Sequence, residues 1–185
     1  MSVTTEHNID GGGNKKPIVL QVLPALETGG VERTAVDMAK AITAAGWTAL
    51  VASEGGRMQH ELDRIGAEHI VLPLASKNPL QIHKNAAQLA ALIYDRSVSL
   101  VHARSRAPAW SALMAARRNK VPFVTTFHGT YSLGGRLKRR YNAIMIRGQR
   151  VIANSTFIAG HIRKNYGVEA AKLKIIHRGV DLNVF

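Results

Sequence analysis

Pro17-Ile-Val-Leu-Gln-Val-Leu-Pro24, followed after two residues by Glu27-Thr-Gly-Gly-Val-Glu-Arg33, is the stretch of sequence that decides the fold. Its first segment is a short apolar run rich in branched residues, which is typical of a buried strand. After the two glycines, apolar residues recur at helical spacing until Gly46, namely Val31, Ala35, Met38 and Ile42. A strand, a glycine turn and a helix in this order predict the first unit of an α/β sheet.

The same alternation continues along the chain. Further strands are predicted at 47–52, 69–72, 99–102, 122–127, 150–153 and 173–176, and helices at 59–65, 79–93, 107–118, 137–144 and 155–165. Because the strands look apolar on both faces, we expect a parallel, doubly wound, Rossmann-like α/β sheet with helices on each side. In such sheets ligands bind beyond the carboxyl ends of the strands, so the loops that follow the strands are the informative positions.

Length and composition fit one globular domain. The chain has 185 residues, 46% of them apolar, and no cysteine, which excludes disulfides and thiolate metal sites.

Residues 1–16 are polar, contain three consecutive glycines and lack the apolar core of a signal peptide, so we interpret them as a flexible leader. No apolar run approaches the roughly 20 residues needed to span a bilayer. We therefore expect a cytoplasmic protein, with peripheral contact to the cytoplasmic membrane face as a further option.

Positive charge is concentrated in the second half of the chain. The net charge is +13, and residues 96–168 contain no Asp or Glu but hold 14 of the 25 Lys and Arg residues. Such a surface predicts an anionic partner, namely acidic lipid headgroups, a phosphorylated or acidic glycan, or nucleic acid. Aromatic residues make up only 5% of the chain, which argues against base stacking and so against nucleic acid.

The first loop after a strand carries Gly29 and Gly30 at the start of a helix. Two glycines permit close approach of a ligand, and the free N–H groups of a helix start attract anions. A nucleotide diphosphate is one candidate ligand, and a plain tight turn without a ligand is the alternative. The loop matches neither the dinucleotide fingerprint nor a P-loop.

Two later loops carry histidines. His128 ends a predicted strand and precedes Gly129, so its imidazole either binds a sugar hydroxyl or bonds to a neighbouring backbone group. His102 ends another strand and is followed by Arg104 and Arg106, which form either a phosphate or carboxylate site or a solvated basic loop.

The run Arg136-Leu-Lys-Arg-Arg-Tyr141 begins a predicted helix. We expect Leu137, Tyr141 and Ile144 to pack on the sheet. We expect Arg136, Lys138, Arg139 and Arg140 to contact an anionic surface such as a membrane. Ser155 is predicted to cap the next helix, and the same free N–H groups allow a binding role. No pair of histidines or carboxylates has the spacing of a metal site, and there is no GxSxG elbow.

Four segments together resemble family 4 glycosyltransferases. They occur in the family's order: Glu-Thr-Gly-Gly-Val-Glu-Arg-Thr (27–34), Thr-Phe-His-Gly (126–129), Ala-Asn-Ser-Thr-Phe (153–157) and His-Arg-Gly-Val-Asp-Leu-Asn-Val-Phe (177–185). The resemblance covers nearly the whole chain after the leader. It implies the N-terminal half of a GT-B fold, in which two Rossmann-like domains enclose the active site.

The resemblance also implies a function. A GT-B enzyme of this family transfers a sugar from a nucleotide-diphosphate sugar to an acceptor, usually with retention of configuration and without a metal. By motif position, Gly29 and Gly30 would approach the donor diphosphate and His128 would act at the donor sugar near its anomeric carbon. Glu32, Arg33, His102, Arg104, Arg106, Gly129 and Ser155 are the further candidates for substrate binding. Arg178 stands where the family usually has Asn.

The expected domain plan follows from the same resemblance. Residues 17–176 form the N-terminal domain, and residues 177–185 begin the crossover to a C-terminal donor domain that this sequence lacks. Because the groups that stabilise the leaving diphosphate lie in that domain, we expect residues 1–185 alone to be inactive. For the intact protein we expect a membrane-associated lipid or glycan acceptor in cell-envelope or lipopolysaccharide synthesis. A sugar-nucleotide epimerase and a Rossmann-like anion- or nucleic-acid-binding module are the alternatives.

Overall fold

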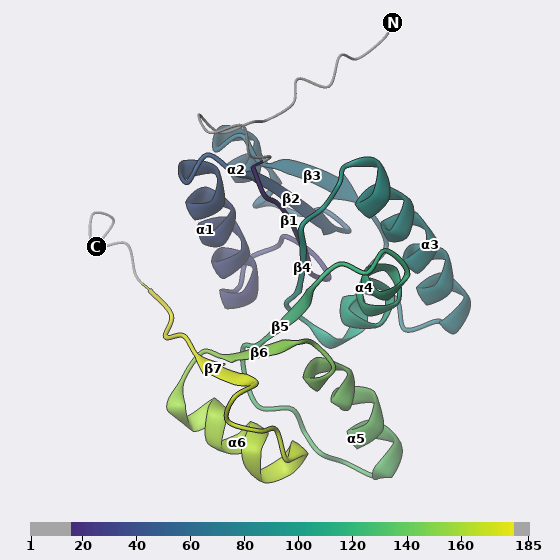
Figure 1. Ribbon diagram of the computed structural model, residues 1–185, viewed down its shortest axis with the longest axis vertical. Coiled ribbons are helices and arrows are strands. Elements are labelled where there is room, and N and C mark those ends of the chain that lie inside the picture. Colours follow the sequence, from purple (N-terminus) through teal and green to yellow (C-terminus); the bar gives the residue numbers. More distant parts are fainter. Residues whose placement is uncertain (1–15, 180–185) are drawn as a thin grey trace, which may run out of the picture.

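Seven parallel strands form a single sheet in the computed structural model, which describes residues 16–179. The strand order is β3-β2-β1-β4-β5-β6-β7 (Figure 1). The strands are β1 (Ile18–Val22), β2 (Thr48–Ser53), β3 (Glu68–Val71), β4 (Leu100–Ala103), β5 (Phe123–Phe127), β6 (Arg150–Ala153) and β7 (Leu173–Ile175). The predicted doubly wound α/β class is thus confirmed. The predicted leader, apart from Lys16, and the crossover beyond Gly179 lie outside the described residues.

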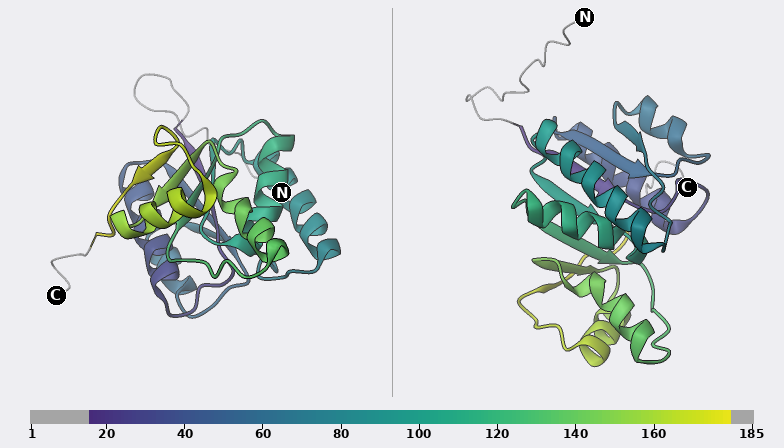
Figure 2. Two further views of the ribbon diagram at one scale, coloured as in Figure 1. Left: turned by 90° about the horizontal axis from the view of Figure 1, so that it is seen from below. Right: turned by 90° about the vertical axis from the view of Figure 1, so that its right-hand side faces the viewer.

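Helices pack on both faces of this sheet (Figures 1 and 2). They are α1 (Gly30–Ala44), α2 (Gln59–Arg64), α3 (Pro79–Asp95), α4 (Arg106–Arg118), α5 (Arg136–Asn142), a 3-10 helix (Ala143–Ile146) and α6 (Thr156–Tyr166). Alternate residues of the strands point to opposite faces, so two separate apolar cores form. One core joins β1 and β2 to α1 and α2, and the other joins the sheet to α3, α4, the 3-10 helix and α6.

Helix ends follow from local chemistry. The Asn78 side chain accepts a hydrogen bond from the Leu80 N–H at 2.9 Å, and Pro79 occupies the first turn of α3. The Ser155 hydroxyl accepts from the Ile158 N–H at 3.2 Å, which confirms Ser155 as the cap of α6. Within residues 16–179, no helix is long and apolar enough to cross a membrane.

The face that carries α1 leaves part of the sheet without a helical cover. There β4 and β5 present His102 and Thr126, so the expectation that every strand is apolar on both faces is wrong at these positions. Their side chains are buried all the same, and they line a cavity together with residues of α1. This polar part of the sheet positions the candidate site.

Candidate functional site

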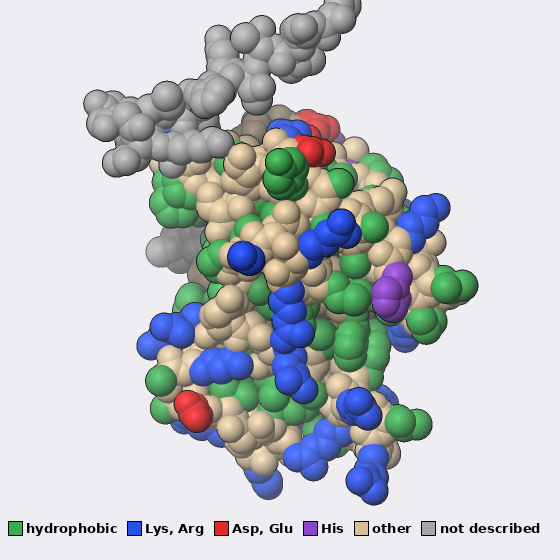
Figure 3. All heavy atoms as spheres, turned by 45° about the vertical axis from the view of Figure 1, so that its right-hand side comes forward, with side chains coloured by type: hydrophobic (Ala, Val, Ile, Leu, Met, Phe, Trp, Pro, Cys, Tyr) green, Lys and Arg blue, Asp and Glu red, His purple; other side chains and the backbone are tan. Residues whose placement is uncertain are grey.

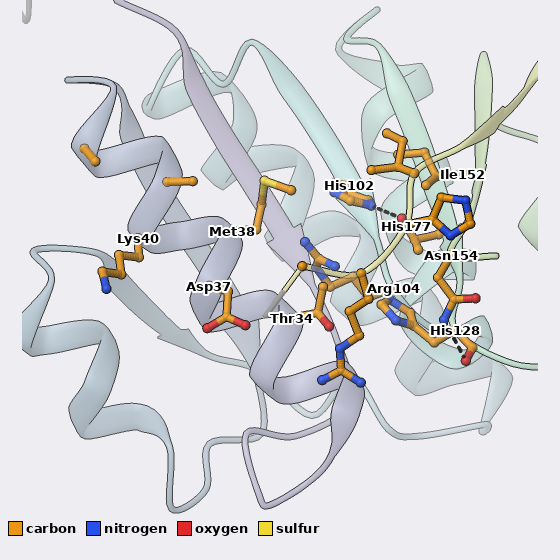
Figure 4. A pocket seen from close by; sticks show the side chains of 16 residues that line it. Thr34, Asp37, Met38, Lys40, His102, Arg104, His128, Ile152, Asn154 and His177 are labelled. Atoms are coloured by element: carbon orange, nitrogen blue, oxygen red, sulfur yellow. Dashed lines mark hydrogen bonds between the residues drawn. The ribbon is translucent and has the colours of Figure 1, made fainter. Parts of the chain in front are cut away.

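Two hollows open near the carboxyl edge of the sheet, where the strand order reverses between β1 and β4. The first, which we call the histidine cavity, holds about 520 Å³ between α1 and the ends of β4, β5 and β6 (Figure 4). Among its lining residues are Thr34, His102, Arg104, Thr126, His128, Asn154 and Arg178. The second, which we call the α5 crevice, holds about 760 Å³ among the loops after β1, β3, β4 and β5 and the start of α5. Its lining includes Lys77, Ser105, Arg106, Tyr131, Lys138 and Tyr141.

His128 lies in the histidine cavity just beyond β5, and its ring is available for a ligand. Its carbonyl accepts a hydrogen bond from Asn154 at 3.2 Å, which anchors the backbone, while the ring Nε2 is buried without a hydrogen-bond partner among residues 16–179. Burial, followed by the nearby charges of Arg104 and Arg178, lowers the pKa of His128 to about 4. The imidazole is therefore neutral at pH 7 and presents one N–H donor and one nitrogen acceptor.

His102 is engaged inside the protein. Its Nε2 lies 2.7 Å from the Thr126 hydroxyl, and both side chains are buried. Burial, with Arg104 and His128 as further causes, lowers the pKa of His102 well below its usual value. The sequence did not single out Thr126, although it lies two residues before His128 and so shares its face of the strand.

Arg104 is a buried cation at the base of the histidine cavity. Only 1% of it is exposed, and its Nε donates to the Gln21 side chain at 2.7 Å. The Gln21 amide in turn donates to the Ala35 carbonyl at 3.1 Å, which ties the arginine to α1. Burial lowers the pKa of Arg104 to about 10 against the opposing effect of Asp37, so the group stays charged at pH 7. Both terminal nitrogens lack a partner within the described part of the chain.

Arg104 helps to keep His128 neutral, which gives a direct test. Replacing Arg104 with Gln removes a positive charge near the ring, so the pKa of His128 should rise from about 4 toward the ordinary value of 6.5. NMR titration of ¹³C-labelled histidines in the full-length protein measures this change. The matched Arg118→Gln variant, which alters an exposed residue at the end of α4, should leave the titration unchanged. An unchanged pKa in Arg104→Gln would rule out this electrostatic coupling.

Gly29 and Gly30 begin α1, and each is closely approached by a side chain. The Glu32 carboxylate contacts the position that a Cβ of Gly29 would occupy, and the Arg178 guanidinium comes within 2.6 Å of the corresponding position at Gly30. No side chain caps this helix end. The Glu32 carboxylate therefore lies close to the first turn of α1, where negative charge is favourable.

The loop before α1, which carries these glycines, is held by hydrogen bonds to the loop that follows β2. The Leu26 N–H donates to the Gly55 carbonyl at 2.7 Å, and the Met58 N–H donates to the Leu26 carbonyl at 2.7 Å. Gly56 packs so closely that a Cβ there would lie 2.5 Å from the Leu26 carbonyl carbon. The approach to α1 is thereby fixed by backbone contacts.

The remaining sequence-predicted residues lie apart from the histidine cavity. Arg33 forms ion pairs with Glu61 of α2 and, at 3.5 Å, with Asp37, so it joins α1 to α2. Gly129 follows His128 in open space, and Ser155 caps α6. Arg106 lines the α5 crevice. Substrate binding by all of these residues stays a prediction.

The basic run at α5 lies on the surface. Arg136, Lys138, Arg139 and Arg140 are all exposed, and Figure 3 shows Lys and Arg side chains spread over the lower half of one face. Leu137 is 84% exposed, so the expectation that it packs on the sheet is wrong, whereas Ile144 is buried as expected. A large apolar side chain is thus displayed among four cations.

Comparisons with known proteins show the family of this chain and solved structures that share its fold. The family model Glycosyltransferase Family 4 matches residues 28–184. A crystal structure of a glycosyltransferase from Rickettsia africae ESF-5 is 42% identical with a TM-score of 0.80, over 91% of this chain and 44% of that one. Anabaena Alr3699/HepE in complex with UDP-glucose is 20% identical with a TM-score of 0.73, over 90% and 45% of the two chains. A search of curated proteins gave no match.

A third solved structure shares the fold. The apo form of the lipopolysaccharide outer core galactosyltransferase WaaB has a TM-score of 0.67 at 12% identity, over 90% of this chain and 46% of that one. This chain therefore spans less than half the length of each of the three structures. The family match extends over most of the chain and confirms the resemblance seen in the four sequence segments. The chain belongs to Glycosyltransferase Family 4.

Proposed function

We propose that the intact protein transfers a sugar from a nucleotide-diphosphate sugar to a lipid or glycan acceptor of the cell envelope. The observation that carries this proposal is the histidine cavity, where the neutral His128 ring and the charged Arg104 meet beside α1 at the carboxyl edge of the sheet. A neutral imidazole suits hydrogen bonding to sugar hydroxyls, and a cation suits the negative charge of a diphosphate. Transfer would retain the anomeric configuration and need no metal.

His128, Gly29 and Gly30 each have a place in this mechanism. His128 would contact the donor sugar at its reacting end through the free ring nitrogen. Gly29 and Gly30 would let the diphosphate approach the free N–H groups of α1, a position where the Glu32 carboxylate now lies. Donor binding would therefore displace Glu32 from the start of the helix.

Two of the similar structures support the substrate classes. The Anabaena protein is in complex with UDP-glucose, which supports a nucleotide-diphosphate sugar as donor. WaaB is a lipopolysaccharide galactosyltransferase, which supports an envelope glycan as acceptor.

The lining of the histidine cavity disfavours the alternative of an epimerase. Among the lining residues described for this cavity, Asp37 is the one acid, and it is paired with Arg33. An epimerase would need acidic catalytic groups there.

Donor binding tests the proposal. Calorimetric titration of the full-length protein should show that nucleoside diphosphates bind at least tenfold more tightly than the matching monophosphates. EDTA should not weaken this binding, because the proposed site uses no metal. Equal affinity for monophosphates and diphosphates of every nucleoside tested would contradict a site for the diphosphate.

We further propose that α5 attaches the protein to the anionic cytoplasmic face of the membrane. The exposed Leu137 can enter the headgroup region while the surrounding cations meet acidic lipids, each contributing about 1 kcal/mol. Replacing Arg136 and Lys138 together with Gln should then weaken binding to phosphatidylglycerol vesicles about 30-fold.

The control for that experiment keeps the same change in charge. Replacing Arg117 and Arg118 of α4 with Gln also removes two cations, but at the opposite end of the strands from the α5 crevice. Co-sedimentation of the full-length protein at low salt measures both variants. Equal losses in the two pairs would show a general charge effect, and no vesicle binding by the wild-type protein would remove the membrane contact altogether.

A further inference from the structure

The α5 crevice lies beside the histidine cavity but is built from different residues. It opens at the carboxyl ends of β1 and β4, where the order of the strands reverses, and sheets of this kind bind their ligands at such a point. Its volume of about 760 Å³ is in the range of small-molecule sites. The loop after β5 contributes to both hollows, with His128 in the histidine cavity and Thr130 and Tyr131 in the crevice.

The lining of the crevice is cationic and has no acid. Lys77 comes from the loop after β3, Arg106 from the start of α4, and Lys138 from α5. Within residues 16–179, none of the three forms an ion pair, and no Asp or Glu lines the crevice. Three elements distant in sequence thus bring positive charge to one place without a counter-ion.

Arg106 is held in a fixed orientation. Its Nη1 donates to the Asn142 side chain at 2.8 Å, and its guanidinium carbon lies 4.2 Å from the centre of the Tyr131 ring. Asn142 is fully buried and donates to the Ser132 carbonyl at 3.0 Å, which fixes the loop that carries Tyr131. A guanidinium held this way loses little entropy when its remaining N–H groups bind a carboxylate or phosphate.

Tyrosines form the other wall of the crevice. Burial raises the pKa of Tyr131 to about 12, so its hydroxyl stays neutral and can donate a hydrogen bond. The Tyr141 ring stacks on Trp110 at 6.0 Å, and its buried hydroxyl has no partner in the described part of the chain. Buried polar atoms are nearly always hydrogen-bonded, so the free Tyr141 hydroxyl indicates a missing ligand or water.

The geometry points to the α5 crevice as the binding site for an acceptor sugar that carries a phosphate or a carboxylate. Arg106 binds the anionic group, with Lys77 and Lys138 adding charge, while the sugar ring lies against the tyrosine wall. This inference rests on the proposed function, because it names the chemistry of the acceptor for that reaction.

Small anionic sugars test the inference in the full-length protein. The probes are glucose 6-phosphate, glucuronate and, as the neutral reference, glucose, with affinities measured by NMR titration. At least one of the two anionic sugars should bind about tenfold or more tightly than glucose. Preference for one of them identifies the anionic group as phosphate or carboxylate.

Variants locate the binding. Arg106→Gln and Lys77→Gln should each weaken binding of the preferred anionic sugar, Arg106→Gln by about tenfold or more, whereas Arg118→Gln on the far end of α4 should not. Lys77 is exposed, so its replacement leaves the fold intact even if Arg106→Gln is unstable. Equal binding of all three sugars, or equal losses in Lys77→Gln and Arg118→Gln, would overturn the inference. Nucleoside diphosphate binding, measured in parallel, should be unchanged in Lys77→Gln. A wild-type protein that binds an anionic sugar but no nucleoside diphosphate would count against the proposed donor site and not against this inference.

Discussion

Replacing His128 with Ala should lower the kcat of the full-length enzyme about 100-fold or more, with little change in the KM for the donor sugar. His128 lines the histidine cavity, its ring nitrogen Nε2 has no hydrogen-bond partner among residues 16–179, and its low pKa keeps the ring neutral across the physiological range. A contact that strengthens as the glycosidic bond breaks changes kcat rather than KM. Steady-state kinetics with the natural donor measure both constants.

A histidine outside the cavity provides the control. His83 is an exposed residue of α3 whose Nδ1 lies 2.8 Å from the Pro79 carbonyl, so His83→Ala makes the same chemical change away from the site. Its kinetic constants should equal those of the wild-type enzyme. If His128→Ala also shows unchanged kinetics, His128 does not belong to the active site.

Replacing Gly56 with Ala should lower the free energy of unfolding by about 2 kcal/mol or more. Gly56 has a φ of +141°, which L-residues rarely adopt, and an added Cβ would lie 2.5 Å from the Leu26 carbonyl carbon. The atoms that this Cβ would meet belong to the backbone of Leu26 and Glu27, so the clash cannot be relieved by a side-chain rotation. The loop that carries Gly29 and Gly30 must shift, and donor KM should rise as well.

A Gly66→Ala variant separates the two expected causes of destabilisation, which are the strain of a positive φ and the clash with Leu26. It has a φ of +70°, but a Cβ there would meet nothing within 4 Å. Gly66→Ala should therefore cost only the strain of a left-handed backbone, about 1 kcal/mol, and leave donor KM unchanged. Urea unfolding gives both free energies. Equal destabilisation in the two variants would show that the contact with Leu26 contributes nothing.

The order of strands and helices could be predicted because local patterns determine it. The strand at 150–153 matches β6, and Ser155 caps α6 as its type and position require. The placement of Leu137 could not be predicted in the same way. The α-helix there ends at Asn142 and continues as a 3-10 helix over Ala143–Ile146, and only the second of these elements buries its predicted apolar residue, Ile144. The apolar spacing alone does not show which turns of the helix reach the sheet.

The candidate site was predictable only in part. His128 and Arg104 follow strands, so their place at the carboxyl edge of the sheet follows from the fold class. The side chains that hydrogen-bond to the site residues could not be predicted, because they come from segments distant in the sequence. Gln21 reaches Arg104 only because β1 pairs with β4, and Arg106 meets Asn142 only because the 3-10 helix after α5 packs against α4. Neither contact has a signature in the local sequence.

Transfer of labelled sugar is the most direct test of the proposed function. The full-length protein would be incubated with membrane lipids and with radiolabelled UDP-, GDP- and ADP-sugars, and label in the lipid fraction would be counted alongside the nucleoside diphosphate released. Label should appear in lipid from at least one donor, in equal amount to the diphosphate, and fall about 100-fold in His128→Ala. A folded wild-type protein that releases no diphosphate and labels no acceptor from any of these donors would contradict the proposal.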